Sequence, residues 1–180
     1  GIGMKEVELK KGFPEHYKWV GPSGASVEAG KDYPLDLSIF PNQKKVLVTC
    51  GTQLAWAKEN LIYQAKQLAK AHPDCHFFVT RGVGGEVFQC ENLMENLSVV
   101  SYLPYKEYIP QMDYVIHHGG AGIFYQCIIY GKPALILPHD YDQFDYAVRG
   151  VEAGVALSAN KEDTRAIGQA FDNLLAKEEI

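Results

Sequence analysis

Residues 117–122 (HHGGAG) place two histidines and three glycines between a predicted strand and a predicted helix. Glycine lets the backbone approach a ligand closely, and a helix start offers free N–H groups and positive potential. This combination predicts a phosphate-binding loop formed by His118, Gly119, Gly120, Ala121 and Gly122. The alternative is a tight turn that only packs the helix against the strand. Neighbouring side chains of an extended segment point in opposite directions, so we expect His117 in the core and His118 beside the loop.

Two familiar phosphate motifs do not fit this loop. The dinucleotide fingerprint G-x-G-x-x-G fails, because Gly120 and Gly122 are followed by Ile123, Phe124 and Tyr125. A Lys-Ser or Lys-Thr pair is also missing, which excludes a P-loop. A diphosphate held without either motif indicates a nucleotide sugar as the ligand.

Residues 138–143 (PHDYDQ) follow another predicted strand and offer polar groups for a sugar. Asp142 and Gln143 provide acceptors and donors that match the vicinal hydroxyls of a hexose. The alternative is that Asp142 caps the helix that follows. Tyr102, at the end of a further strand, is either a base-stacking ring or a core tyrosine. For Arg81 a solvated loop arginine is favoured over a phosphate contact.

The elements that must position these residues begin at Lys45. Short apolar strands alternate with helical spacings, which is typical of βαβ units around a parallel sheet. We predict an α/β fold, a Rossmann-like three-layer domain with about six parallel strands, whose ligand crevice lies at the carboxyl ends of the strands. The predicted strands are 45–50, 76–80, 97–103, 114–117, 134–137 and 155–157, the helical segments are 56–71, 106–111, 123–130, 143–153 and 164–177, and 81–95 is predicted as a loop.

Residues 1–44 differ from the rest, because glycines and prolines punctuate them and leave space only for a short strand near 17–20. We predict that 1–44 is a lead-in or interdomain segment and that 45–180 is the nucleotide-sugar-binding domain. A lead-in of this kind is expected of a piece cut from a longer protein.

The composition of the 180 residues is that of a globular protein, with 47% hydrophobic and 22% charged residues. The net charge of −5 argues against nucleic acid or an anionic membrane as the main partner. No apolar run approaches the roughly 18 residues of a membrane span. The four cysteines show neither a C-x-x-C pair nor the spacing of a metal site, so we expect reduced thiols and a cytoplasmic protein.

These loops, in this order, resemble the C-terminal donor-binding half of UDP-glycosyltransferases with the GT-B fold, of the bacterial macrolide and antibiotic type. The resemblance covers nearly the whole chain, including 14–22, 48–52 (VTCGT) and 102–104 (YLP). It is most specific over 118–143 (HGGAGIFYQCIIYGKPALILPHDYDQ), where the glycine loop, the Gly-x-Pro and the Pro-x-x-x-Asp-Gln keep the spacing of the family.

The resemblance implies a role for each site residue. Gly51 and Thr52 would lie at the diphosphate, Tyr102 would stack on the base, and the backbone of Leu103 would pair with it. His118 and the backbone of residues 119–122 would hold the phosphates, and Asp142 and Gln143 would bind the sugar hydroxyls. Three positions depart from the family: Ile123 replaces a Ser or Thr at the phosphate, Gln126 replaces the Glu that binds the ribose, and Tyr105 replaces a Gln or His.

In such enzymes the N-terminal half supplies the acceptor pocket and the histidine base, so we expect no catalytic residue in this chain. The resemblance implies an inverting transfer of a hexosyl group from a UDP- or dTDP-sugar to an acceptor hydroxyl, with no metal and no further cofactor. The expected partners are the nucleotide sugar and the acceptor-binding half, and the chain alone is expected to be inactive. The alternatives are a separate donor-binding subunit of a two-chain glycosyltransferase and a domain related to nucleotide-sugar epimerases, for which only Asp140 and Asp142 offer carboxylates.

Overall fold

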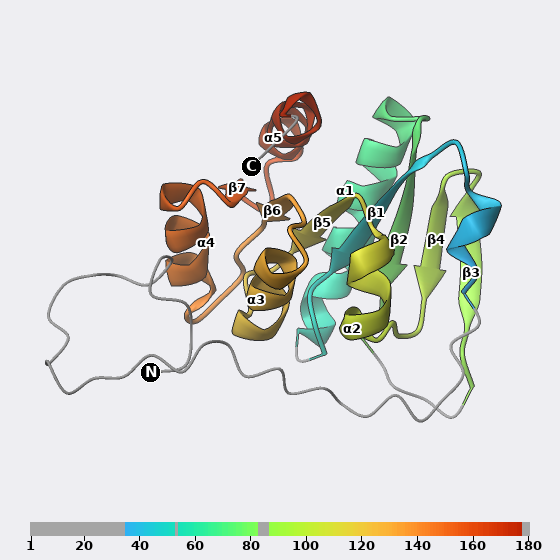
Figure 1. Ribbon diagram of the computed structural model, residues 1–180, viewed down its shortest axis with the longest axis horizontal. Helices are drawn as coiled ribbons and strands as arrows, with labels where there is room; N and C mark the ends of the chain where they lie inside the picture. The colour runs from blue at the N-terminus through green and yellow to red at the C-terminus, as the bar shows by residue number, and fades with distance from the viewer. Residues whose placement is uncertain (1–34, 53, 83–86, 178–180) are drawn as a thin grey trace, which may run out of the picture.

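The computed structural model describes residues 35–52, 54–82 and 87–177. Its centre is a seven-stranded sheet with the order β3-β4-β2-β1-β5-β6-β7 (Figure 1). All neighbouring strands are parallel except β3 and β4, which pair antiparallel. The strands are β1 (Lys44–Thr49), β2 (Cys75–Thr80), β3 (Cys90–Met94), β4 (Leu97–Val100), β5 (Tyr114–His117), β6 (Ala134–Ile136) and β7 (Ala156–Ser158).

The predicted α/β fold is confirmed, with two differences at one edge of the sheet. Residues 81–95, predicted as a loop, contain β3. The first three residues of β3 are exposed, as expected of an edge strand that lacks an apolar face. The predicted strand 97–103 ends at Val100, and Pro104 precedes the short helix α2 (Tyr105–Tyr108) and the 3₁₀ turn η3 (Ile109–Gln111).

Helices cover both faces of the sheet, so that helices, sheet and helices form three layers (Figure 1). The longer helices are α1 (Lys58–Ala71), α3 (Ala121–Ile129), α4 (Gln143–Glu152) and α5 (Thr164–Ala176), and α1 is preceded by the 3₁₀ turn η2 (Ala55–Ala57). One face of the sheet packs against α1 and α5, through Leu61, Ile167 and Phe171. The other face packs against α2, α3 and α4, through Tyr108, Phe124 and Ala147.

The predicted division between 1–44 and 45–180 stays a prediction. Residues 1–34, with the strand expected near 17–20, lie outside the described part of the chain. The described residues before β1 form the 3₁₀ turn η1 (Leu37–Ile39), whose Leu37 is buried in the core under α2 and α3. Phe40 packs edge-on against Phe78 of β2, with ring centroids 5.4 Å apart.

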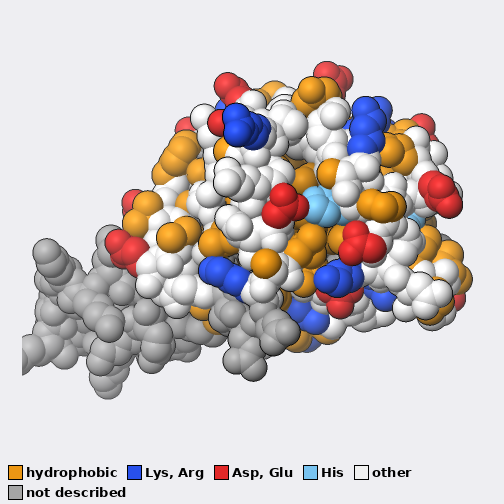
Figure 2. Space-filling view, turned by 90° about the horizontal axis from the view of Figure 1, so that it is seen from above, with side chains coloured by type: hydrophobic (Ala, Val, Ile, Leu, Met, Phe, Trp, Pro, Cys, Tyr) orange, Lys and Arg blue, Asp and Glu red, His pale blue; other side chains and the backbone are white. Residues whose placement is uncertain are grey.

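On the face that Figure 2 shows, acidic and basic side chains are interspersed, and neither sign dominates. Mixed charge of this kind gives no continuous field for a polyanion on that face. In the part of the chain that the structure describes, no helix has the length and the apolar character needed to cross a membrane.

Candidate functional site

The site is built at the carboxyl ends of the strands, where β1, β5 and β6 each lead into a loop. The sheet order places β5 between β1 and β6, so the glycine loop after β5 lies between the other two loops. The next helix, α3, begins at Ala121, and Gly120 occupies its N-cap position without a side-chain cap. The first N–H groups of a helix have no partner within it, so α3 presents free donors and positive potential at this edge.

His117 is a core residue, as predicted. It is fully buried, and its Nδ1 accepts a hydrogen bond from the backbone N–H of Gly119 at 3.0 Å. Burial, together with the neighbouring His118, lowers the pKa of His117 to about 3, so the ring is neutral. This bond fixes the turn from which the glycine loop starts. Gly119 itself adopts a φ of +93°, in the left-handed region that favours glycine.

His118 lies between the loop after β1 and the glycine loop. A Cβ added to Gly51 would lie 2.9 Å from Cε1 of His118, and one added to Gly120 would lie 2.5 Å from its Nε2. A side chain at either position would therefore displace this ring. His118 is only partly buried, yet its Nδ1 is shielded and has no hydrogen-bond partner among the described residues.

The electrostatic surroundings keep His118 neutral in the free protein. Burial and the nearby His139 lower the pKa of His118 to about 4, while the backbone of Thr49 and the carboxylate of Asp142 act in the opposite direction. An anion bound beside the ring would favour its charged form. A neutral, shielded imidazole at a helix start is thus able to gain a proton when a phosphate arrives.

The turn after β1 is held by a network of hydroxyl groups. The Thr49 hydroxyl receives hydrogen bonds from the Gly51 N–H at 3.1 Å and from the Thr80 hydroxyl at 2.8 Å, and it bonds the Tyr105 hydroxyl at 2.9 Å. Burial raises the pKa of Tyr105 to about 12. Tyr105, which stands where the family has Gln or His, therefore ties α2 to β1 and does not present its hydroxyl to a base.

The loop after β2 supports the same turn from the other side. Gly82 has a φ of +64°, and a Cβ on it would lie 2.2 Å from the backbone oxygen of Gly51. Lys58 at the start of α1 donates to the carbonyl of Arg81. The Arg81 guanidinium lies 3.6 Å from the Glu91 carboxylate on β3, and both are exposed, which supports the loop-arginine interpretation.

The loop after β6 meets the glycine loop at Gln143. A Cβ on Gly119 would lie 2.9 Å from the backbone oxygen of Gln143. The Gln143 side chain is buried, and its Oε1 accepts from the backbone N–H groups of His139 at 2.9 Å and Asp140 at 3.1 Å. Oε1 of Gln143 thus holds the loop after β6 in place.

Asp142 is exposed and occupies the N-cap position of α4, but its side chain makes no capping hydrogen bond. The neighbouring Tyr141 has a φ of +54°, a strained value for a residue other than glycine. Strain of this kind is concentrated at functional sites. The capping alternative therefore loses its main support, and the Asp142 carboxylate is free to act toward solvent or a ligand.

The remaining predicted residues fall into two groups. Leu103 and Ile123 are buried with their side chains in the core, so only their backbones can face a ligand. Tyr102 and Gln126 are partly exposed, and Oε1 of Gln126 is shielded without a hydrogen-bond partner among the described residues.

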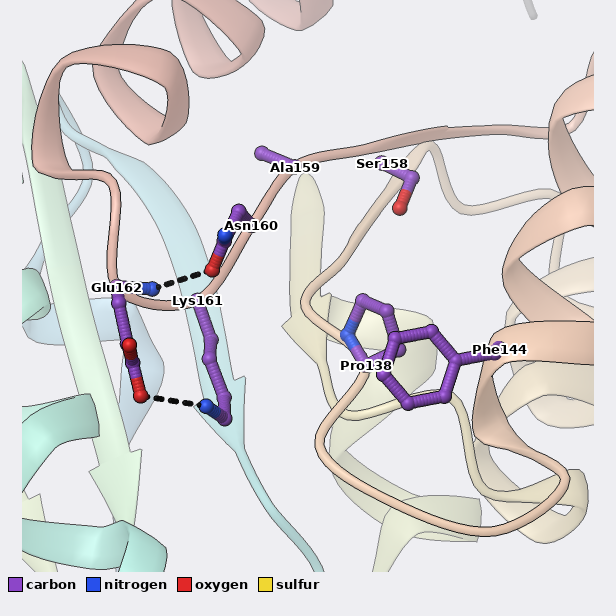
Figure 3. A pocket seen from close by; sticks show the side chains of 7 residues that line it. All are labelled: Pro138, Phe144, Ser158, Ala159, Asn160, Lys161 and Glu162. Carbon is purple, nitrogen blue, oxygen red and sulfur yellow. Dashed lines mark hydrogen bonds and ion pairs between the residues drawn. The ribbon is translucent and has the colours of Figure 1, made fainter.

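A cavity of about 510 Å³ lies beside this site, on the far side of the loop after β6. Figure 3 shows Lys161 and Glu162, joined by an ion pair at 2.8 Å, on one side of it, and Pro138 and Phe144 on the other. No motif of the sequence indicates this cavity, because its lining joins Pro138 after β6 and Phe144 of α4 to residues 158–162 at the end of β7 and beyond. Among the described residues, no three His, Cys, Asp or Glu side chains are grouped to hold a metal ion.

Comparison with known proteins matches the chain to one family. The profile of the family "Erythromycin biosynthesis protein CIII-like, C-terminal domain" matches residues 84–179, more than half of the chain. The Bacillus subtilis (strain 168) protein "Uncharacterized UDP-glucosyltransferase YdhE" is 25% identical over 171 residues, which cover 93% of this chain and 42% of that protein. The chain therefore spans about two fifths of the length of this relative.

Solved structures share the fold. The glycosyltransferase of kitacinnamycin superposes with a TM-score of 0.71 at 21% identity, over 88% of this chain and 41% of that one. Spinosyn rhamnosyltransferase SpnG, solved with thymidine diphosphate, gives a TM-score of 0.63 at 21% identity over 76% of this chain and 38% of that one. The three-layer architecture described above is thus that of one part of longer glycosyltransferases.

Proposed function

Because the chain belongs to the family of erythromycin biosynthesis protein CIII-like C-terminal domains, we propose that it binds the nucleotide-diphosphate sugar donor of a glycosyltransferase. The observation that carries the proposal is the placement of His118. Its ring packs against Gly51 and Gly120 at the start of α3, with a shielded nitrogen that lacks a partner among the described residues. A diphosphate at this point accepts from the free N–H groups of the helix start and favours the charged form of the neighbouring imidazole.

The proposed arrangement of the donor follows the order of the loops. The diphosphate lies against His118, the backbone of residues 119–122 and the turn at Gly51 and Thr52. The base lies at Tyr102 and the backbone of Leu103, and the ribose at the partly exposed Gln126. The sugar extends toward Asp142 and the amide N–H groups of Gln143. A bound thymidine diphosphate in the structural relative SpnG supports a UDP- or dTDP-sugar as the donor.

In the whole enzyme we propose an inverting transfer. A base on the acceptor-binding half takes the proton of an acceptor hydroxyl, and the hydroxyl oxygen attacks the anomeric carbon of the donor. The bond from that carbon to the diphosphate breaks, and the electron pair leaves on the diphosphate oxygen. The helix start and His118 stabilise that developing charge, so the reaction needs neither a metal nor a further cofactor from this chain.

The same proposal places the protein in the cytoplasm. All four cysteines, among them the fully buried Cys50 and the exposed Cys90, are free thiols in the structure. Free thiols suit a reducing compartment. The epimerase alternative gains no support, because the relative YdhE and the structural relative SpnG are a UDP-glucosyltransferase and a rhamnosyltransferase by name.

Calorimetric titration of the chain with UDP, dTDP, UDP-glucose and NAD tests the proposal. We expect weak binding of a nucleoside diphosphate or its sugar, with a dissociation constant of roughly 0.1–1 mM, because half of the cleft is supplied by another part of the enzyme. NAD is expected not to bind, since the dinucleotide fingerprint is missing. Absence of binding by every diphosphate at millimolar concentration would contradict the proposal, as would transfer to an acceptor by the chain alone.

A further inference from the structure

Trp56 stands out among the exposed apolar residues because of what it contacts. The residue is 63% exposed and lies in η2, directly after the turn at the end of β1. Its ring meets the ring of His139 edge-on, with centroids 5.8 Å apart and an interplanar angle of 65°. A single exposed apolar residue is common and carries no function by itself. A tryptophan that reaches from one ligand-site loop to another is a different case.

The contact between Trp56 and His139 bridges the glycine loop. Trp56 follows β1 and His139 follows β6, while the strand between them in the sheet, β5, leads into the loop of His118. His139 also acts electrostatically on the glycine loop, because it contributes to the lowered pKa of His118. His139 also belongs to the same loop as Asp142, which follows it by three residues.

His139 gives Trp56 a fixed support. The carbonyl of Leu137 lies 2.7 Å from Nδ1 of His139 and can only accept, so this nitrogen carries a proton. The backbone N–H of His139 donates to Oε1 of the buried Gln143. The Leu137 carbonyl thus holds the ring that Trp56 touches, and the Gln143 side chain holds the backbone of the same residue. A support that is fixed before the ligand binds lowers the ordering cost of binding.

The chemistry of an indole suits one part of the donor. The face of an aromatic ring carries negative charge, so it attracts the weakly positive C–H bonds on the face of a hexose ring. Diphosphate and ribose offer mainly charge and hydroxyls, which the glycine loop and Gln126 are placed to bind. Asp142 can hold hydroxyls at the edge of a hexose, which leaves the apolar face of that ring uncovered.

We propose that Trp56, supported by His139, is the platform on which the hexosyl ring of the donor stacks. This inference rests on the proposed function. It adds that the sugar of the donor is a neutral hexose, one face of which is formed by C–H bonds without polar groups. Trp56 then selects for the sugar and leaves the nucleotide unaffected. The resemblance to UDP-glycosyltransferases implies no role for Trp56.

The test compares UDP and UDP-glucose by calorimetric titration into the wild-type chain and into Trp56→Ala, Trp56→Phe and Tyr63→Ala. Tyr63 is a matched control, because it is an exposed aromatic residue on α1. In Trp56→Ala we expect the affinity for UDP-glucose to fall about three- to tenfold while the affinity for UDP is unchanged. Trp56→Phe should keep most of the affinity, and Tyr63→Ala should match the wild type.

Fluorescence gives an independent readout. The chain has two tryptophans, so the Trp19→Phe variant leaves Trp56 as the only indole. UDP-glucose should change its emission and UDP should not. An unchanged ratio of the two affinities in Trp56→Ala, or an equal loss for both ligands, would overturn the inference and leave the proposed function intact. A folded wild-type chain that binds neither ligand would overturn both.

Discussion

Replacing the two adjacent histidines separately distinguishes a structural residue from a ligand-binding one. His117→Ala removes a fully buried ring and leaves the buried N–H of Gly119 without its acceptor. An unsatisfied buried donor costs about 1–3 kcal/mol, and the cavity left by a ring adds a similar amount or more. We therefore expect the free energy of unfolding to fall by about 3–5 kcal/mol, or roughly 10 °C in melting temperature.

His118→Ala should behave in the opposite way. Its ring is partly exposed and makes no hydrogen bond through Nδ1 to the described residues, so its loss should lower the free energy of unfolding by about 1 kcal/mol or less. A hydrogen bond to a charged phosphate is worth about 1.5–3 kcal/mol, which corresponds to a ten- to hundredfold loss of UDP affinity. His118→Asn, which keeps a donor, should lose less.

Thermal melts and calorimetric titration with UDP, carried out on both alanine variants, measure the two effects. The melts establish which variant is folded at the temperature of the titration. If folded His117→Ala loses UDP while His118→Ala retains the wild-type affinity, the two rings have been assigned to the wrong sides of β5, and the reasoning is refuted.

Three further predictions concern the neighbouring loops and the buried histidines. Asp142→Ala should weaken UDP-sugar binding by about 1–3 kcal/mol and leave UDP binding unchanged. If calorimetric titration shows the same ratio of UDP-sugar affinity to UDP affinity in the variant and the wild type, Asp142 has a structural role at the start of α4 and does not bind the sugar. Gly82→Ala should destabilise the fold by more than the control Gly131→Ala and should weaken UDP binding. Both glycines have a positive φ, but only at Gly82 would an added Cβ clash with backbone atoms, those of Gly51. Equal melting temperatures of the two variants would contradict this prediction. Finally, burial lowers the pKa of His76, His117 and His118 from 6.5 to about 4, 3 and 4, respectively. The unfolded chain therefore binds more protons than the folded one, so the stability that these rings contribute is complete above pH 6.5 and is lost as the pH falls toward 4. In urea unfolding at pH 7, 6 and 5, the free energy of unfolding should decline by up to about 1.4 kcal/mol per pH unit for each histidine, and a flat profile would be inconsistent with burial.

The parallel part of the sheet could be predicted because each of its strands is a short apolar run followed by a turn. β5 was predicted with the bounds that the structure shows, and β1 with bounds one residue away. β3 could not be predicted in this way. Its residues 90–94 (CENLM) are mostly exposed, so neither alternation nor an apolar run marks them, and only pairing with β4 makes them a strand.

The parts of the candidate site that a local sequence motif forms could be predicted. The parts that depend on contacts between distant residues could not. The glycine loop and the burial of His117 follow from residue types and their order. The role of Gln143 as an acceptor for two backbone N–H groups depends on how its own loop folds back. The contact of Trp56 with His139 joins residues 83 positions apart across β5, and the bond between Tyr105 and Thr49 joins residues 56 apart. No spacing along the chain indicates either contact.

The central claim is that a nucleoside diphosphate binds at the glycine loop, and backbone amide NMR shifts during a UDP titration test it most directly. We expect the largest shifts at the N–H groups of Gly51, Gly119, Gly120, Ala121 and Gly122, at the start of α3, with smaller ones at Leu103. Shifts confined to the cavity lined by Ser158, Asn160 and Lys161, or no shifts at millimolar UDP, would contradict the account.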